Sequence, residues 1–99
     1  MRKITSEAAE HFLLGVKYSN GNTFVTYDEQ SGYVILWLHG NEIARRRDVN
    51  IEIRTAGWPT TTTKERLNGL PGVQVYHKNK ILFLNGKPWE NHEDWTAVK

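Results

Sequence analysis

The alternation of apolar and polar residues predicts a helix at the start of the chain, followed by a series of strands. In residues 4–16 apolar side chains recur every three or four positions, which is the period of an amphipathic helix. Thr5 or Ser6 is the expected N-cap, because a hydroxyl there accepts a hydrogen bond from a free N–H of the first turn. Gly15 is the expected stop, since glycine readily adopts the left-handed conformation that ends many helices.

Short segments rich in β-branched and aromatic residues follow, separated by Asn-Gly and related turns. Strands are expected at 15–18, 23–27, 33–39, 42–46, 50–55, 73–77, 81–84 and, as an edge strand, 95–98. Consecutive strands joined by tight turns predict an antiparallel meander. The segment 33–39 is apolar on both faces, and the N-terminal helix is expected to cover one of them. A partner subunit is a candidate cover for the other face, so a homodimer is expected.

A second, short helix is predicted at about 62–68. Thr62 and Glu65 have the spacing of a capping box, in which each side chain satisfies a backbone N–H near the other. Gly69 and the Pro71-Gly72 pair are expected to end this helix. The predicted fold is therefore α+β: one domain over residues 1–99, with a single antiparallel sheet of five or six strands, an N-terminal helix and a short helix inserted between strands.

The composition excludes several classes of protein. The 99 residues include no cysteine, which rules out disulfide staples, Cys-ligated zinc and a thiol nucleophile. A small domain without staples is more typical of the cytoplasm than of secreted proteins. No apolar run approaches the ~20 residues of a membrane span, so no membrane association is expected. The net charge of +2 permits nucleic-acid binding without arguing strongly for it.

The most distinctive segment is 56–69, AGWPTTTTKERLNG, in which four threonines precede a basic helical turn. N–H groups and hydroxyls at the start of a helix can hold a phosphate, and basic side chains can add charge. The candidate binding residues are Trp58, Thr60, Thr61, Thr62, Lys64 and Arg66. The G-x-x-x-x-G-K-[ST] pattern of a P-loop is absent. The alternative is a well-capped short helix with Trp58 packed in the core.

Two further basic groups are candidate binding residues. On a strand, Arg45 and Arg47 share one face and Arg46 lies on the other. They are candidates for contact with phosphate or an acidic partner, or they form a solvated hairpin end that protects a strand edge. Lys78 and Lys80 flank a predicted hairpin tip next to aromatic residues. Such a tip can bind single-stranded nucleic acid by stacking, or simply be well solvated.

No pattern of catalytic or metal-ligating residues is present. None of the four histidines stands at a metal-ligand spacing with a glutamate, and the carboxylates are scattered. We therefore assign no catalytic residue, metal or cofactor, and expect a protein that is not an enzyme. A small hydrolase or nuclease is the alternative, and it requires a histidine and a carboxylate to meet in a cleft.

Three segments resemble a group of small bacteriophage-encoded proteins of unassigned function. They are HGNEIARR at 39–46, AGWPTTTTKERLNG at 56–69 and LFLNGKPWE at 82–90. The resemblance implies a phage gene product that acts in the cytoplasm of a bacterial host, and it supplies no site residues. Small phage proteins of this kind often bind and block a host protein. A host protein or complex, in defence or transcription, is therefore the expected partner, with nucleic-acid binding as the alternative.

Overall fold

The computed structural model describes residues 2–98 of the chain. In this range lie two helices, α1 (Lys3–Leu14) and α2 (Thr61–Asn68). The strands before α2 are β1 (Tyr18–Asn20), β2 (Thr23–Tyr27), β3 (Val34–Leu38), β4 (Asn41–Arg47) and β5 (Asn50–Ile53). Those after it are β6 (Val75–Lys78), β7 (Ile81–Leu84), β8 (Lys87–Pro88) and β9 (Thr96–Ala97).

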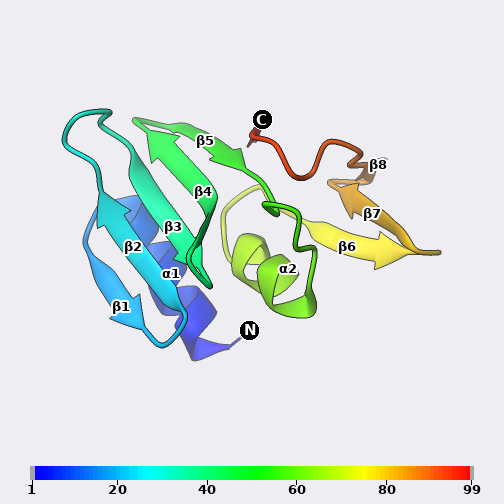
Figure 1. Ribbon diagram of the computed structural model, residues 1–99, viewed down its shortest axis with the longest axis horizontal. Coiled ribbons are helices and arrows are strands. Elements are labelled where there is room, and N and C mark those ends of the chain that lie inside the picture. The colour runs from blue at the N-terminus through cyan, green and yellow to red at the C-terminus, as the bar shows by residue number, and fades with distance from the viewer. Residues whose placement is uncertain (1, 99) are drawn as a thin grey trace.

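The strands form two separate sheets (Figure 1). Six strands make a large antiparallel sheet in the order β1-β2-β3-β4-β5-β9, and β6, β7 and β8 make a small one. The α+β class, the six-stranded antiparallel sheet and both helices are thus confirmed. The strands after α2 do not extend the large sheet, because β6 pairs with β7 instead of with β5. The expected edge strand at the end of the chain returns to pair with β5.

Helix α1 begins two residues before the expected N-cap. Arg2 occupies the N-cap position without a side-chain cap, so the assignment of Thr5 or Ser6 to that position is wrong. Thr5 lies within the helix and is 1% exposed, because its side chain is directed toward α2. Gly15 ends the helix as expected, with a left-handed φ of 73° and its N–H donated to the carbonyl of His11.

Thr60, rather than Thr62, caps α2. The Thr60 hydroxyl accepts a hydrogen bond from the N–H of Thr63 at 3.2 Å. The predicted capping box of Thr62 and Glu65 is wrong, because Glu65 faces α1 and accepts a hydrogen bond from the Thr5 hydroxyl at 2.7 Å.

Gly69 follows α2 where the two helices meet, and a Cβ atom there would lie 2.7 Å from Cγ2 of Thr5. The missing side chain at this position lets the helices approach closely.

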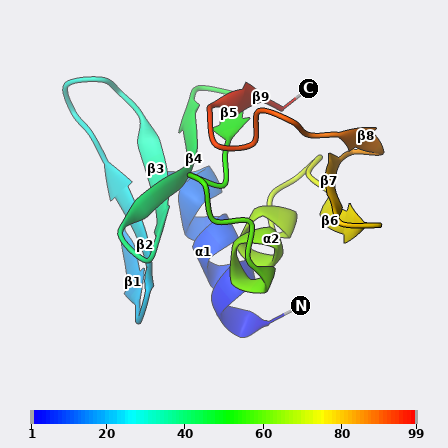
Figure 2. The same cartoon turned by 45° about the vertical axis from the view of Figure 1, so that its right-hand side comes forward.

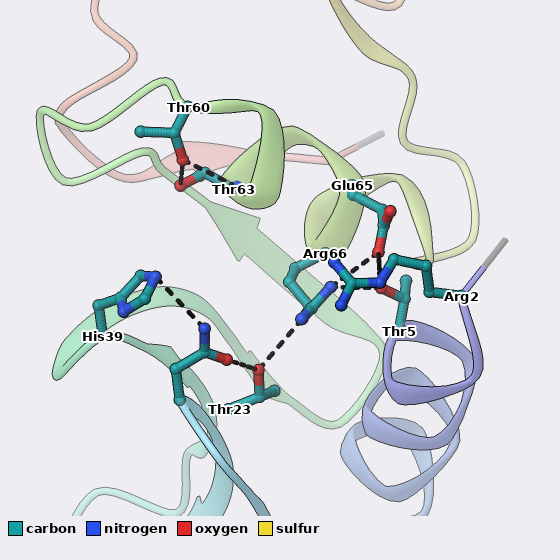
Figure 3. A network of polar contacts seen from close by, with 9 residues as sticks. Arg2, Thr5, Thr23, His39, Thr60, Thr63, Glu65 and Arg66 are labelled. Atoms are coloured by element: carbon teal, nitrogen blue, oxygen red, sulfur yellow. Dashed lines mark hydrogen bonds and ion pairs between the residues drawn. The ribbon is translucent and has the colours of Figure 1, made fainter.

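A buried arginine joins α1, β2 and α2 (Figure 3). Arg66 is 2% exposed. Its Nε donates to the hydroxyl of Thr23 at 3.1 Å, and its Nη1 donates to the hydroxyl of Thr5 at 2.7 Å and to Glu65 Oε1 at 2.8 Å. These partners offset the cost of removing a guanidinium from water. The hydrogen bond from Thr5, followed by the charges of Arg2 and Arg66, lowers the pKa of Glu65 below its ordinary value of 4.5.

Both helices pack against the same face of the large sheet, which we call the helix face (Figure 2). The register places Val25, Leu36, Ala44 and Ile53 side by side there, and all four are buried. The small sheet adds to the same core through Val75 and Leu82. We call the opposite face the outer face. Successive residues of a strand point to opposite faces, so the outer face carries the side chains of the intervening residues, among them Phe24, Ile35, Trp37, Arg45 and Glu52.

Candidate functional site

A hollow of about 550 Å³ lies between the β3–β4 turn and the start of α2. We call it the Trp58 pocket. Its lining comes from two segments that are distant in the chain and that both contributed to the phage-protein resemblance. The lining residues are Leu38, His39, Asn41, Ile43, Thr55, Trp58, Thr60, Thr62 and Thr63. The volume is within the range of ligand pockets in proteins.

The first wall of the Trp58 pocket depends on the two-residue turn between β3 and β4. His39 and Gly40 both have left-handed φ angles, of 51° and 79°, which reverse the chain tightly between β3 and β4. The register then shifts between Leu36 and Trp37, as in a β-bulge. The bulge places the buried side chain of Ile43 at the pocket wall beside Leu38.

The second wall is the segment between β5 and α2. Ala56 and Gly57 have left-handed φ angles of 56° and 87°, so the chain turns sharply after β5. The N–H of Trp58 donates to the carbonyl of Thr55 at 3.0 Å and closes this turn. The indole of Trp58 is 62% exposed, so the alternative that placed it in the core is wrong. The turn presents a large apolar side chain to solvent.

The lining of the Trp58 pocket includes no lysine, arginine, aspartate or glutamate side chain, and its polar groups are of other kinds. They are hydroxyls, the amide of Asn41 and the imidazole of His39, which lies 3.3 Å from the amide of Asn22. The hydroxyl of Thr55 lies 2.6 Å from Nδ1 of His92, which ties the pocket floor to the C-terminal segment. A pocket with apolar walls and without a lysine or arginine side chain suits an apolar or aromatic group better than a phosphate.

The basic residues expected beside the threonines lie elsewhere. Arg66 points into the interior, as described above. The Nζ of Lys64 lies 2.8 Å from Nδ1 of His77, in a separate hollow between α2 and β6. Burial, followed by the charge of Lys64, lowers the pKa of His77. Neither Lys64 nor Arg66 lines the Trp58 pocket, and Thr61 faces the hollow that contains Lys64.

Arg45, Arg46 and Arg47 alternate between the two faces of the large sheet, as predicted. Arg46 lies on the helix face, where its Nε and Nη2 donate to the carbonyls of Phe12 and Leu13, both at 2.8 Å. It therefore satisfies carbonyl groups at the end of α1, which have no partner within the helix. Arg45 and Arg47 lie on the outer face.

The outer face holds a row of alternating arginine and aromatic side chains that the sequence pattern did not reveal. Guanidinium groups and rings follow one another in the order Arg47, Tyr33, Arg45, Trp95, Arg54, with 4.3 to 4.6 Å between each guanidinium carbon and the neighbouring ring centroid. We call this row the arginine–aromatic ladder. Its members come from β4, from the residues flanking β3 and β5, and from the residue before β9, so strand pairing is needed to bring them together.

Lys78 and Lys80 lie at the exposed tip of the β6–β7 hairpin, as expected. Tyr76 and Phe83 stack on each other on this hairpin with their ring centroids 5.3 Å apart. The hairpin belongs to the small sheet, whereas Arg45 and Arg47 belong to the large one. The predicted basic residues therefore do not come together in one patch.

The histidines of residues 2–98 make their side-chain hydrogen bonds with groups other than carboxylates. Their partners are the carbonyl of Glu7 for His11, Asn22 for His39, Lys64 for His77 and Thr55 for His92. In the same part of the chain, no group of three or more histidine and acidic side chains could hold a metal ion. No helix within residues 2–98 is long and apolar enough to cross a membrane.

Comparison with known proteins agrees with the resemblance drawn from the three segments. A family model described as Kyanoviridae Gp96 protein matches residues 1–98. No curated protein and no solved structure matches the chain. The family match includes both walls of the Trp58 pocket and nearly the whole chain. The chain therefore belongs to the Kyanoviridae Gp96 protein family, a family of phage proteins.

Proposed function

We propose that this phage protein binds a host protein in the bacterial cytoplasm, and that the Trp58 pocket receives an uncharged apolar or aromatic side chain of that protein. The observation that carries this proposal is the convergence of residues 38–43 and 55–63 on one pocket with an exposed tryptophan. An indole that stays exposed after folding does not contribute the stability that its burial would give. Tryptophan is also enriched among the residues that dominate binding between proteins.

The chemistry of the pocket favours a protein partner over nucleic acid at this site. Affinity for nucleic acid depends mainly on lysine and arginine contacts with phosphates. The lining residues include neither. A side chain that enters the pocket instead gains apolar contact with Leu38, Ile43 and Trp58, and its polar atoms meet hydroxyl and amide groups at the rim.

The test compares tagged wild-type protein with the Trp58→Ala and Val49→Ala variants in lysate of the host. Val49 is 91% exposed and lies outside the pocket, so Val49→Ala is the matched control for losing an exposed apolar side chain. We expect wild type and Val49→Ala to retain the same host protein and Trp58→Ala to lose it. With the purified partner, Trp58→Ala is expected to weaken binding about 30-fold, as for a central tryptophan of an interface.

Three results would contradict the proposal. The first is capture of the same host protein by wild type and Trp58→Ala. The second is loss of all captured material after nuclease treatment, together with affinity that falls steeply with salt, which would support the nucleic-acid alternative. The third is retention of no host protein by wild type at near-physiological salt.

A further inference from the structure

The arginine–aromatic ladder holds its guanidinium groups in place on the outer face. Arg45 Nε donates to Glu52 Oε1 at 2.9 Å, and Arg54 Nε donates to the carbonyl of Glu42 at 2.7 Å. The ring of Trp95 contacts both groups, with each guanidinium carbon 4.3 Å from its centroid. Each arginine is thus fixed by its Nε and by the indole, and little side-chain entropy remains to be lost when a ligand binds.

The outer ends of these two guanidinium groups are available to a ligand. Within residues 2–98, the Nη atoms of Arg45 and Arg54 make no hydrogen bond to protein atoms. The Nη ends of arginine form a planar fork of N–H donors that matches the two oxygens of a carboxylate. Two such forks therefore lie beside the same indole. The Nε atom of each arginine is hydrogen-bonded to the protein, and the Nη atoms have no protein acceptor within residues 2–98.

The charge of the ladder is only partly compensated within the described residues. Arg45 forms an ion pair with Glu52, whereas Arg47 and Arg54 have no acidic side chain within ion-pair distance. Arg45 and Arg54 both lie against Trp95, so their positive charges are close together. Carboxylates bound to the two guanidinium groups would reduce this repulsion.

The ladder favours carboxylates over the bases of a nucleic acid. Single-stranded nucleic acid binds such surfaces by stacking its bases on aromatic rings. Here Tyr33 contacts the guanidinium groups of Arg45 and Arg47, and Trp95 contacts those of Arg45 and Arg54. A base would have to compete with arginines for these rings, whereas a carboxylate uses the free forks without disturbing them.

We propose that the outer face binds an extended acidic segment of a partner protein, with carboxylates at alternate positions seated on Arg45 and Arg54. Because both guanidinium carbons lie 4.3 Å from one centroid, they are separated by at most twice that distance. Alternate residues of an extended strand are about 6.8 Å apart and point to the same side, which satisfies this limit. This surface is on the side of the sheet opposite the helices, so the inference does not depend on the Trp58 pocket.

The test uses fluorescence anisotropy with a labelled peptide of alternating Glu and Thr at low ionic strength. Arg54→Gln is expected to weaken binding about tenfold, the loss of one charge-assisted bidentate contact. Arg54→Lys keeps the charge but not the fork and is expected to weaken it about threefold. Lys87→Gln removes an equal charge from an exposed position in β8 of the small sheet and is expected to change affinity less than twofold. The Trp95 indole N–H of wild type should shift in NMR spectra as peptide is added.

Several outcomes would overturn this inference. They are equal weakening by Lys87→Gln and Arg54→Gln, equal binding of a peptide with the same number of glutamates at every third position, tighter binding of oligothymidylate, and an unmoved Trp95 signal. The Trp95 signal is read on wild type, so the inference stays testable even if an arginine variant unfolds. Trp58→Ala should bind the acidic peptide like wild type, which separates failure here from failure of the pocket proposal.

Discussion

Arg66 stabilises the junction of α1, β2 and α2 because its guanidinium occupies a position that solvent hardly reaches. Its donors meet hydroxyl groups on both neighbouring elements and the carboxylate of the adjacent Glu65. Arg46 stabilises the end of α1 in a similar way, by donating hydrogen bonds to two of its carbonyl groups, although part of its guanidinium remains exposed. Two of the basic residues that were candidates for binding thus contribute to stability.

Replacing Arg66 by Met is expected to lower the free energy of unfolding by about 2 kcal/mol. Stability falls because the buried hydroxyls of Thr5 and Thr23 no longer accept hydrogen bonds from a charged guanidinium. Urea denaturation measures it, with Lys17→Met as the exposed control, for which a change below about 0.5 kcal/mol is expected. Equal stability of the two variants would contradict the role of Arg66.

Replacing Thr5 by Val is expected to raise the pKa of Glu65 toward its ordinary value of 4.5, because the Thr5 hydroxyl is the largest cause of its lowering. A carboxyl with a lowered pKa in the folded state stabilises the fold above its unfolded pKa and loses that contribution as pH falls through the folded value. The stability difference between wild type and Thr5→Val should therefore be largest above pH 4.5 and shrink in acid. NMR titration of the Glu65 carboxyl carbon, with urea midpoints against pH, measures both effects.

At the scale of elements, the crossing of α1 and α2 positions the second wall of the Trp58 pocket. Helix α2 carries Thr62 and Thr63 into the pocket, and its C-terminal end rests on α1 at Gly69. Helix α2 therefore lines the Trp58 pocket at one end and lies against α1 at the other.

Gly69→Ala is expected to destabilise the protein by about 1–3 kcal/mol, since the new methyl group meets Cγ2 of Thr5 in a packed interior. The backbone of Gly69 has a φ of −74°, so the cost comes from contact rather than from backbone strain. The double variant with Thr5→Ser removes Cγ2 while keeping the hydroxyl, and it should recover part of the loss. Thermal unfolding of the single and double variants measures this, and absence of recovery would contradict the proposed clash.

At the scale of the molecule, the two sheets share one core. Val75 and Leu82 of the small sheet belong to the same buried cluster as Leu36 and Ile53 of the large sheet. Sheets that share a core are expected to unfold together.

The homodimer remains a prediction. It was motivated by the apolar outer face of β3, where the arginine–aromatic ladder lies next to Ile35. Light scattering at high protein concentration measures the mass of the particle in solution, and the mass of a monomer would contradict the homodimer.

Leu82→Ala is expected to cost about 2–3 kcal/mol and to lower the stability of both sheets equally. Leu14, which is exposed at the end of α1, supplies the matched control, and Leu14→Ala should change stability by less than about 0.5 kcal/mol. Amide hydrogen exchange in β3 and β7 reports on each sheet separately. A loss of protection confined to β7 would show that the small sheet unfolds on its own.

The sequence by itself determined the elements, because helix and strand periods are local properties of neighbouring residues. The two helices, the antiparallel order of the strands before α2 and the alternation of Arg45, Arg46 and Arg47 between faces followed from this period. Local patterns also led to the segment 56–69, which supplies one wall of the Trp58 pocket. The phage-protein resemblance rested on the same short segments.

Tertiary structure alone decided which side chains meet. The burial of Arg66, the exposure of Trp58 and the actual cap of α2 each depend on where α1 and the β3–β4 turn lie relative to α2. The arginine–aromatic ladder unites Tyr33, Arg45, Arg54 and Trp95, which are dispersed along the chain and become neighbours through strand pairing. Contacts between distant residues reflect packing of the whole chain, and no local period encodes them.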